Sequence, residues 1–167
     1  MVYWLTFVRE EDLEKLPYLV KFKDWIVLLK ASIDKVLFEA GTGFEVANIE
    51  EQYIYYKEGG KFEAHLDTQC NPLRDCKKGT DHHYPRLLTW IIFLNPGWKH
   101  SDGGYYHTYW NWPELDLKEV VAPTLGKSVI IRADKTYHSA ELVNTEKRAI
   151  SLFVNVKPSV TVLPEDI

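Results

Sequence analysis

The sequence predicts a mainly β domain with helices at its N-terminal end, arranged as a barrel or jelly roll. Apolar residues recur at helical spacing in the first quarter, whereas from Phe44 onward they form short runs separated by turn residues. The aromatic share of 14% also favours β structure. A chain of 167 residues fits one domain, so we expect a helical buttress over residues 1–43 and a jelly-roll core over residues 44–167.

The main N-terminal helix is predicted from apolar residues that lie three or four positions apart and therefore share one helix face. They are Tyr18, Phe22, Trp25, Ile26, Leu29, Ile33, Val36 and Leu37. Gly41-Thr42-Gly43 ends this helix. A shorter helix is predicted around Glu10–Leu16, closed near Pro17. We expect both helices to cover one face of a sheet.

The strands are predicted from short apolar or alternating runs after residue 44. They are Val46–Tyr56, Phe62–Asp67, Leu87–Asn95, Gly104–Tyr109, Lys127–Ile131 and Lys147–Val156. Turn signals separate them, among them Glu58-Gly59-Gly60 and Asp102-Gly103-Gly104. Many short strands after a helical start favour a jelly roll over an open sheet.

Composition excludes several classes of function. A net charge of −4 and a pI of about 5.9 leave no basic field for a phosphate backbone, so nucleic acid is not an expected partner. The central apolar run from Trp90 to Leu94 is too short to cross a membrane. The apolar start is broken by Arg9-Glu10-Glu11-Asp12, so no signal peptide is expected. Two cysteines make no disulfide framework, which favours the reducing cytoplasm.

A metal site is predicted from His65 and Asp67, because residues two apart on a strand point to the same side. With a second imidazole from a distant segment, they would form a triad of two histidines and one carboxylate. Such a triad suits Fe(II) and leaves coordination positions open. His138 is the candidate third ligand, since a strand and a turn precede it. A solvated surface pair of His65 and Asp67 is the alternative interpretation.

An anion site is predicted from Arg148, which alternates with apolar residues in the last strand. If Ile150, Leu152 and Val154 face the barrel interior, Arg148 does so too. A buried guanidinium is costly without an anionic partner, and its planar fork suits a carboxylate. Two alternatives remain open: Arg148 pairs with an internal acidic residue, or the register is shifted by one residue.

The order of these motifs resembles that of the Fe(II)/2-oxoglutarate-dependent dioxygenases, with the prolyl 4-hydroxylase-like branch nearest. The resemblance covers roughly Gln52 to Val156. Its motifs are Tyr56, Gly60, His65-x-Asp67, the stretch Leu88–Asn95, Gly103-Gly104, His138 and Arg148 ten residues later. Each motif alone is permissive, and their shared order carries the resemblance.

The resemblance implies a double-stranded β-helix (a cupin-like jelly roll) that holds iron through His65, Asp67 and His138. It implies that Arg148 binds the distal carboxylate of 2-oxoglutarate, with the Tyr56 hydroxyl as a helper. Molecular oxygen would be the other cosubstrate, ascorbate would support turnover, and 2-oxoglutarate would be converted to succinate and CO2. No catalytic side chain is expected beyond the metal centre.

Some positions depart from the pattern of the family. Val154 stands where prolyl hydroxylases commonly carry a Trp, six residues after the basic residue, which puts a prolyl substrate in doubt. Phe93 replaces a Tyr that helps to hold 2-oxoglutarate in the oxygen-sensing branch, and Tyr106 is a candidate to compensate. Val154 also replaces the second Arg of the nucleic-acid demethylating branch. The Asp67 carboxylate favours hydroxylation, since the halogenating relatives have a small residue there.

Two further groups of residues have alternative interpretations. Cys70, Cys76, His82 and His83 lie in the long loop Thr68–Arg86 and are of zinc-ligating types, but their spacing fits no familiar zinc motif. The preferred interpretation is a loop that covers the entrance of the site. Trp110 and Trp112 are either core residues or an apolar wall for the substrate, and His100 and His107 are expected at the surface or in hydrogen bonds.

The sequence therefore predicts an Fe(II)- and 2-oxoglutarate-dependent hydroxylase, acting on a peptidyl residue such as proline. A hydroxylase of a free amino acid or small metabolite is the second candidate. A non-catalytic jelly-roll module that binds a ligand is the candidate from another class. Retention of His65, Asp67, His138 and Arg148 favours an enzyme.

Overall fold

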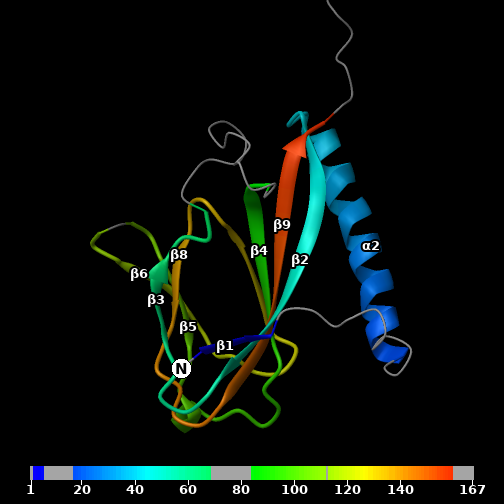
Figure 1. The fold of residues 1–167 in the computed structure, drawn as a ribbon. Helices are drawn as coiled ribbons and strands as arrows, with labels where there is room; N and C mark the ends of the chain where they lie inside the picture. The colour runs from blue at the N-terminus through cyan, green and yellow to red at the C-terminus, as the bar shows by residue number, and fades with distance from the viewer. Residues whose placement is uncertain (1, 6–16, 69–83, 112, 160–167) are drawn as a thin grey trace, which may run out of the picture.

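The computed structural model describes residues 2–5, 17–68, 84–111 and 113–159 (Figure 1). Its first elements are the strand β1 (Val2–Leu5) and the helix α2 (Pro17–Glu39). The remaining strands are β2 (Phe44–Tyr56), β3 (Phe62–His65), β4 (Arg86–Phe93), β5 (Tyr106–Tyr109), β6 (Leu117–Val121), β7 (Ser128–Arg132), β8 (Tyr137–Ala140) and β9 (Lys147–Pro158). A short 3-10 turn, η1 (His100–Asp102), precedes β5.

The strands form two antiparallel sheets, as the jelly-roll prediction requires (Figure 1). The larger sheet has the order β1-β2-β9-β4-β7 and the smaller one the order β3-β8-β5-β6. Both sheets contribute to a shared interior, because Ile91 and Phe93 of β4 cluster with Tyr106 of β5. The prediction of a mainly β jelly roll is confirmed.

Helix α2 packs against the outer face of the larger sheet, alongside β2 (Figure 1). Leu37 belongs to a buried cluster with residues of β2, β4 and β9, and Trp25 meets Trp90 edge-on with ring centroids 5.4 Å apart. The predicted helix and its role as a buttress are confirmed. Val36 is an exception, because 62% of it is exposed. The predicted helix at Glu10–Leu16 lies outside the described residues.

Three strands were not predicted. The first 43 residues contain β1, which pairs with β2 at the edge of the larger sheet. β6 is an edge strand with exposed positions and two charged residues, so it lacks an alternating pattern. β8 has only four residues, too few for a periodicity argument. Short and edge strands gain their definition from their neighbours rather than from their own sequence.

The prediction that Arg148, Ile150, Leu152 and Val154 face the barrel interior is wrong. β9 is a central strand covered on both faces, by α2 on one side and by the smaller sheet on the other. Its residues from Ala149 to Val156 are therefore buried on both faces, and alternation carries no information about which face is inside. The register pairs Lys147 with Tyr56 and Arg148 with Tyr55, and it is the Lys147 face that looks inward.

Within the described residues, no helix combines the length and the apolar character that crossing a bilayer requires.

Candidate active site

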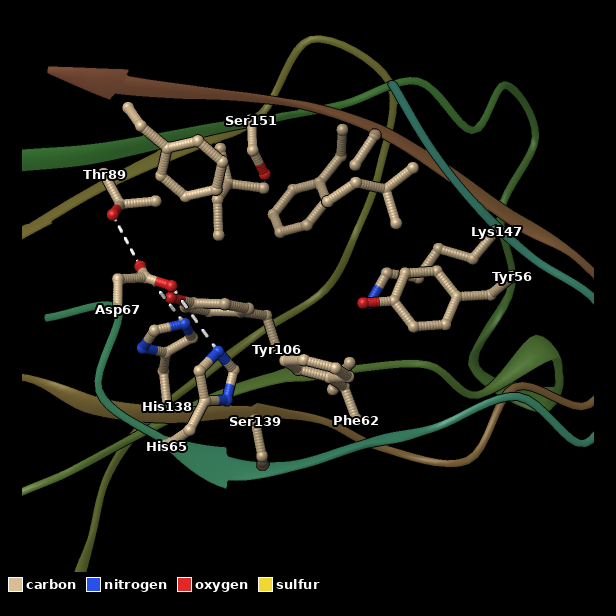
Figure 2. Close-up of a pocket in the computed structure, with 16 residues that line it drawn as sticks. Tyr56, Phe62, His65, Asp67, Thr89, Tyr106, His138, Ser139, Lys147 and Ser151 are labelled. Carbon is tan, nitrogen blue, oxygen red and sulfur yellow. Dashed lines mark hydrogen bonds and ion pairs between the residues drawn. The ribbon is translucent and has the colours of Figure 1, made fainter. Parts of the chain in front are cut away.

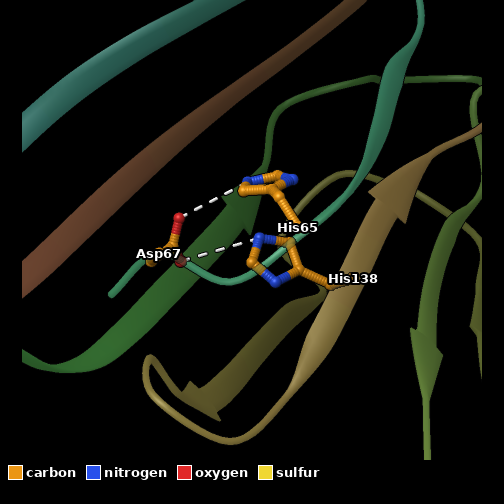
Figure 3. Close-up of side chains that lie close together, drawn as sticks. All are labelled: His65, Asp67 and His138. Atoms are coloured by element: carbon orange, nitrogen blue, oxygen red, sulfur yellow. Dashed lines mark ion pairs between the residues drawn. The ribbon is translucent and has the colours of Figure 1, made fainter. Parts of the chain in front are cut away.

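Three side chains that can ligate a metal converge at one end of the interior (Figure 3). They are His65 at the end of β3, Asp67 in the loop that follows, and His138 on β8, and their ligand atoms lie within 4.8 Å of one another. β3 and β8 are neighbours, and their register places His65 directly opposite His138. The structure thus brings together the three residues that the sequence singles out.

Backbone carbonyls fix the orientation of both imidazoles. His65 Nδ1 bonds to the carbonyl oxygen of Glu63 at 2.8 Å, and His138 Nδ1 bonds to that of Thr136 at 3.1 Å. A carbonyl only accepts, so each Nδ1 carries the proton and each Nε2 keeps its lone pair. The Nε2 atoms face opposite oxygens of Asp67, at 3.5 Å from His65 and 3.6 Å from His138. This is the ring arrangement that a metal-ligating histidine needs.

The electrostatics also suit a cation. Burial raises the pKa of the Asp67 carboxyl, but its interactions with His65, His138 and Thr89 outweigh burial and hold this pKa below its usual value. Burial lowers the pKa of His138, which favours its neutral imidazole. Neutral imidazoles and an ionised carboxylate are the forms that bind metal ions.

A pocket of about 50 Å³ leads from this metal-ligating triad through the space between the two sheets (Figure 2). Its walls come from both sheets: Thr89, Ile91 and Phe93 of β4 lie opposite residues of β3, β5 and β8. Figure 2 shows the triad at one end and the side chains of Tyr56 and Lys147 at the other. The pocket thus joins a cation-binding end to a cationic end.

Lys147 is the basic residue of this pocket. It is only 3% exposed, its Nζ donates a hydrogen bond to the carbonyl oxygen of Gly104 at 2.9 Å, and it lies 4.7 Å from the centre of the Tyr56 ring. Burial lowers the pKa of Lys147 to about 7. No carboxylate of the described residues forms an ion pair with Lys147. A buried amine without a counter-charge is suited to binding an anionic ligand.

Arg148 lies outside the pocket, contrary to the sequence-based prediction. Its side chain is 57% exposed, donates to Glu146 at 2.7 Å and lies 5.7 Å from the centre of the Tyr55 ring. A shift of one residue in the register of the last strand was one of the two alternatives left open for Arg148, and the structure shows this shift. Counting six residues from Lys147 instead of Arg148 leads to Phe153, an aromatic residue of the pocket wall. Counted from Lys147, this position is aromatic but still departs from the Trp of the family pattern.

Two tyrosines line the pocket as well. Tyr56 is buried beside Lys147, and burial raises its pKa to about 12. Tyr106 is 3% exposed, and burial, together with the nearby Asp67 and Tyr56, raises its pKa well above 10. Both phenols keep their protons and can act as hydrogen-bond donors. Phe93, which has no hydroxyl, is also in the pocket wall.

The other candidate residues lie elsewhere. His100 is hydrogen-bonded to the Tyr105 hydroxyl, and both His100 and His107 lie outside the pocket between the sheets, as expected. Trp110 is 67% exposed beneath the Lys118 ammonium and does not line this pocket. Trp112 and the proposed loop or zinc ligands Cys70, Cys76, His82 and His83 lie outside the described residues.

Sequence reasoning missed Lys147, although a signal was present. On the inner face of β9, Lys147 is followed by Ala149 and Ser151. Small residues next to a buried base leave room for a ligand, whereas the Arg148 face carries bulky Ile150 and Leu152 without such room. Weighing side-chain size along each face would have favoured Lys147.

A jelly roll with two histidines and a carboxylate at one end of its interior is the architecture of a metal-dependent oxygenase. The 2OG-Fe(II) oxygenase superfamily matches residues 51–155, more than half of the chain. The chain belongs to this superfamily, and it is a dioxygenase enzyme. A search of curated proteins found no match.

Solved prolyl hydroxylases share the fold. A prolyl-4-hydroxylase of Pseudomonas putida superposes with a TM-score of 0.60 and 19% identity, over 92% of this chain and 69% of that one. A Trichoplax adhaerens prolyl hydroxylase, in complex with a hypoxia inducible factor peptide fragment, gives 0.59 and 18%, over 92% and 61%. A viral collagen prolyl hydroxylase of Paramecium Bursaria Chlorella virus-1, in complex with 2OG, gives 0.56 and 18%, over 92% and 79%. At these identities the likeness concerns the fold.

Proposed function

We propose that this protein is an Fe(II)- and 2-oxoglutarate-dependent hydroxylase of a peptidyl residue such as proline. One observation carries the proposal: a metal-ligating triad and a buried lysine face each other along a single pocket. A small dianion that chelates a metal with one end and presents a carboxylate at the other matches both ends. 2-Oxoglutarate is such a molecule.

The donor set fits iron. His65, Asp67 and His138 would hold Fe(II) through two neutral imidazoles and one carboxylate, which leaves positions for cosubstrates. When bound, the iron supplies the oxidising chemistry, using O2 and the electrons of 2-oxoglutarate, which is converted to succinate and CO2. The protein residues orient the ligands, exclude water and place the anionic end of the cosubstrate. Ascorbate would support turnover, and the cysteine content supports a cytoplasmic location.

Lys147, and not Arg148, is proposed to bind the distal carboxylate of 2-oxoglutarate. The ammonium lies inside the pocket, and a carboxylate there would supply the counter-charge that it lacks. Tyr56 lies opposite Lys147 in the register of β2 and β9, which supports a role for its hydroxyl at the same carboxylate. Arg148 is already paired with Glu146 at the surface.

A peptidyl substrate is supported by the fold. The described chain shares the jelly roll of prolyl hydroxylases, one of which is in complex with a peptide fragment. Six residues after Lys147 stands Phe153, which is aromatic like the Trp that prolyl hydroxylases commonly carry there but is not that Trp. A free amino acid or small metabolite would be the substrate if no peptide is modified.

The proposal is tested by incubating the protein with Fe(II), 2-oxoglutarate, ascorbate and a library of peptides and metabolites. We expect succinate together with a product that is 16 Da heavier than its parent. Lys147→Met should weaken 2-oxoglutarate binding about tenfold to a hundredfold, as a lost charge-assisted hydrogen bond does, whereas Arg148→Met should leave it unchanged. Absence of metal-dependent 2-oxoglutarate binding would instead favour a non-catalytic module, and an effect of Arg148→Met alone would refute the assignment of Lys147.

A further inference from the structure

The Tyr106 hydroxyl is a buried donor whose partner is missing. Four buried side-chain polar atoms have no hydrogen-bond partner within the described part of the chain: Trp90 Nε1, Tyr106 Oη, Thr108 Oγ1 and Asn155 Oδ1. Of these four residues, Tyr106 is the one that lines the pocket between the sheets. A buried hydroxyl without a partner is destabilising, so its presence in a pocket wall indicates a partner that arrives with a ligand.

The ring of Tyr106 is held so that this hydroxyl points to the metal-ligating triad. The ring stacks on His138, with centroids 5.5 Å apart and planes 30° apart, and packs against Phe93 at 6.1 Å. Figure 2 shows the hydroxyl directed toward Asp67 and the two imidazoles, away from Lys147. The hydroxyls of Tyr106 and Tyr56 thus lie toward opposite ends of the same pocket (Figure 2).

The neighbouring polar groups leave this donor for a ligand. Asp67 already accepts from Thr89 Oγ1 at 2.5 Å and faces the Nε2 atoms of both histidines. Those Nε2 atoms are the lone pairs that a metal would use, so neither imidazole keeps an acceptor for Tyr106 once a metal is bound. The Tyr106 hydroxyl also makes no hydrogen bond to Asp67 in the structure. A molecule bound at the metal can supply the acceptor.

We propose that Tyr106 donates a hydrogen bond to the oxalyl end of 2-oxoglutarate, the carboxylate and keto group that chelate the metal. This inference rests on the proposed function, since it concerns the same cosubstrate. Lys147 then fixes the distal carboxylate and Tyr106 fixes the reacting end. Tyr106 is a cosubstrate-binding residue in this arrangement, and its neutral phenol donates rather than ligating the metal.

The test is calorimetric titration of the Mn(II)-loaded protein, without oxygen, with 2-oxoglutarate and with oxalate. Oxalate carries the chelating end but has no distal carboxylate to reach Lys147. Tyr106→Phe should weaken binding of both ligands about tenfold, with unchanged Mn(II) affinity. Lys147→Met should weaken the binding of 2-oxoglutarate but not the binding of oxalate. Tyr109→Phe is the matched control: it removes a hydroxyl from the same strand, bonded to Ser139 at 2.8 Å, and should affect neither ligand.

Thermal unfolding without metal gives a second measurement. Because Tyr106→Phe removes an unpartnered hydroxyl, its midpoint should equal or exceed that of the parent, whereas Tyr109→Phe should lower it. Unchanged oxalate affinity in Tyr106→Phe would overturn the inference, as would weaker Mn(II) binding, which would make Tyr106 a metal ligand. If the Mn(II)-loaded parent protein binds neither 2-oxoglutarate nor oxalate, the proposed function itself fails. This outcome is distinct from the two results in Tyr106→Phe that would overturn the inference.

Discussion

Asp67 belongs to the smaller-sheet side of the pocket, yet a residue of the larger sheet holds its carboxylate. Thr89 on β4 donates its hydroxyl to Asp67 Oδ2, the same oxygen that faces His138. A metal needs its ligands aligned before it binds, and groups behind the ligands supply that alignment. We therefore expect Thr89 to position Asp67 for the proposed metal.

Thr89→Val should weaken metal binding about tenfold to a hundredfold, because the isosteric side chain loses the hydroxyl that orients Asp67. Calorimetric titration with Mn(II) measures the change. Thr108→Val is the matched control, since Thr108 is an equally buried threonine whose hydroxyl has no partner within the described residues. Equal metal affinities in the two variants would contradict a positioning role for Thr89.

The buried amine of Lys147 makes 2-oxoglutarate binding depend on pH. With a pKa of about 7 in the free protein, Lys147 is largely protonated at pH 6 and largely neutral at pH 8, and Glu141 partly opposes this depression of the pKa. The bound carboxylate favours the ammonium form. At pH 8 we therefore expect proton uptake on binding and weaker affinity than at pH 6, measured by calorimetry in buffers of different ionisation enthalpy.

The stability of the ligand-free protein should show the opposite trend. In the unfolded chain Lys147 has a pKa near 10.5, so between pH 7 and pH 10.5 the unfolded state binds more protons than the folded state. Stability from this group therefore rises with pH across that window. Lys147→Met should remove both the proton uptake and this contribution to the pH dependence, and a variant that keeps them would show that another group titrates.

At the scale of elements, β9 shows why part of the site was hidden in the sequence. The nearness of His65 and Asp67 could be predicted because they lie two residues apart, a local relation that does not depend on the strand bounds. The identity of the basic residue depends on which face of β9 is inside. The strands and the helix around β9 decide which face is inside. The alternation of residues within β9 does not indicate it, because both faces are buried.

The glycine turn before β5 holds the Lys147 side chain. Gly104 has a φ of +72°, and a Cβ at this position would lie 3.0 Å from Val143 Cγ2 and 3.1 Å from Lys147 Cδ. Its carbonyl oxygen also accepts the hydrogen bond from Lys147 Nζ. The Gly103-Gly104 motif noted in the sequence can thus be explained physically, because a glycine at position 104 leaves space for the buried Lys147 side chain.

Gly104→Ala should weaken 2-oxoglutarate binding by displacing Lys147, as well as lowering the thermal midpoint. Gly126→Ala is the control, because Gly126 has a similar φ of +78° but nothing within 4 Å of the added Cβ. It should lower the midpoint through backbone strain alone and leave the affinity unchanged. A parallel loss of affinity in both variants would assign the effect to destabilisation instead of to Lys147.

Over the whole molecule, the fold class was within reach of the sequence because the change from helical to strand periodicity is sharp at residue 44. The helix α2 and six of the strands follow from their own apolar patterns. β1, β6 and β8 do not, since they are short or at an edge and owe their geometry to hydrogen bonds with neighbours. Tyr106 reaches the metal end only because β5 and β8 pair side by side, a relation that no local pattern reveals.

The apolar clusters of the two sheets and α2 provide a core that does not depend on a metal. We therefore expect the protein to stay folded in chelator, with an unchanged far-ultraviolet circular dichroism spectrum. Metal that binds only the folded state should still raise stability, by about 2.7 kcal/mol at a free concentration one hundred times the dissociation constant. For a chain of this size that corresponds to roughly 5–10 °C in the midpoint.

Asp67→Asn should abolish most of this metal-induced shift, because the carboxylate that neutralises the cation is lost. Glu63→Gln is the matched control: it neutralises an exposed carboxylate on β3, the strand just before Asp67, paired with Lys61 at the surface, and should retain the full shift. Thermal unfolding of both variants with Mn(II) and with chelator measures the difference. A full shift in Asp67→Asn would place the metal elsewhere, whereas loss of circular dichroism in chelator alone would show that the metal, and not the apolar core, holds the two sheets together.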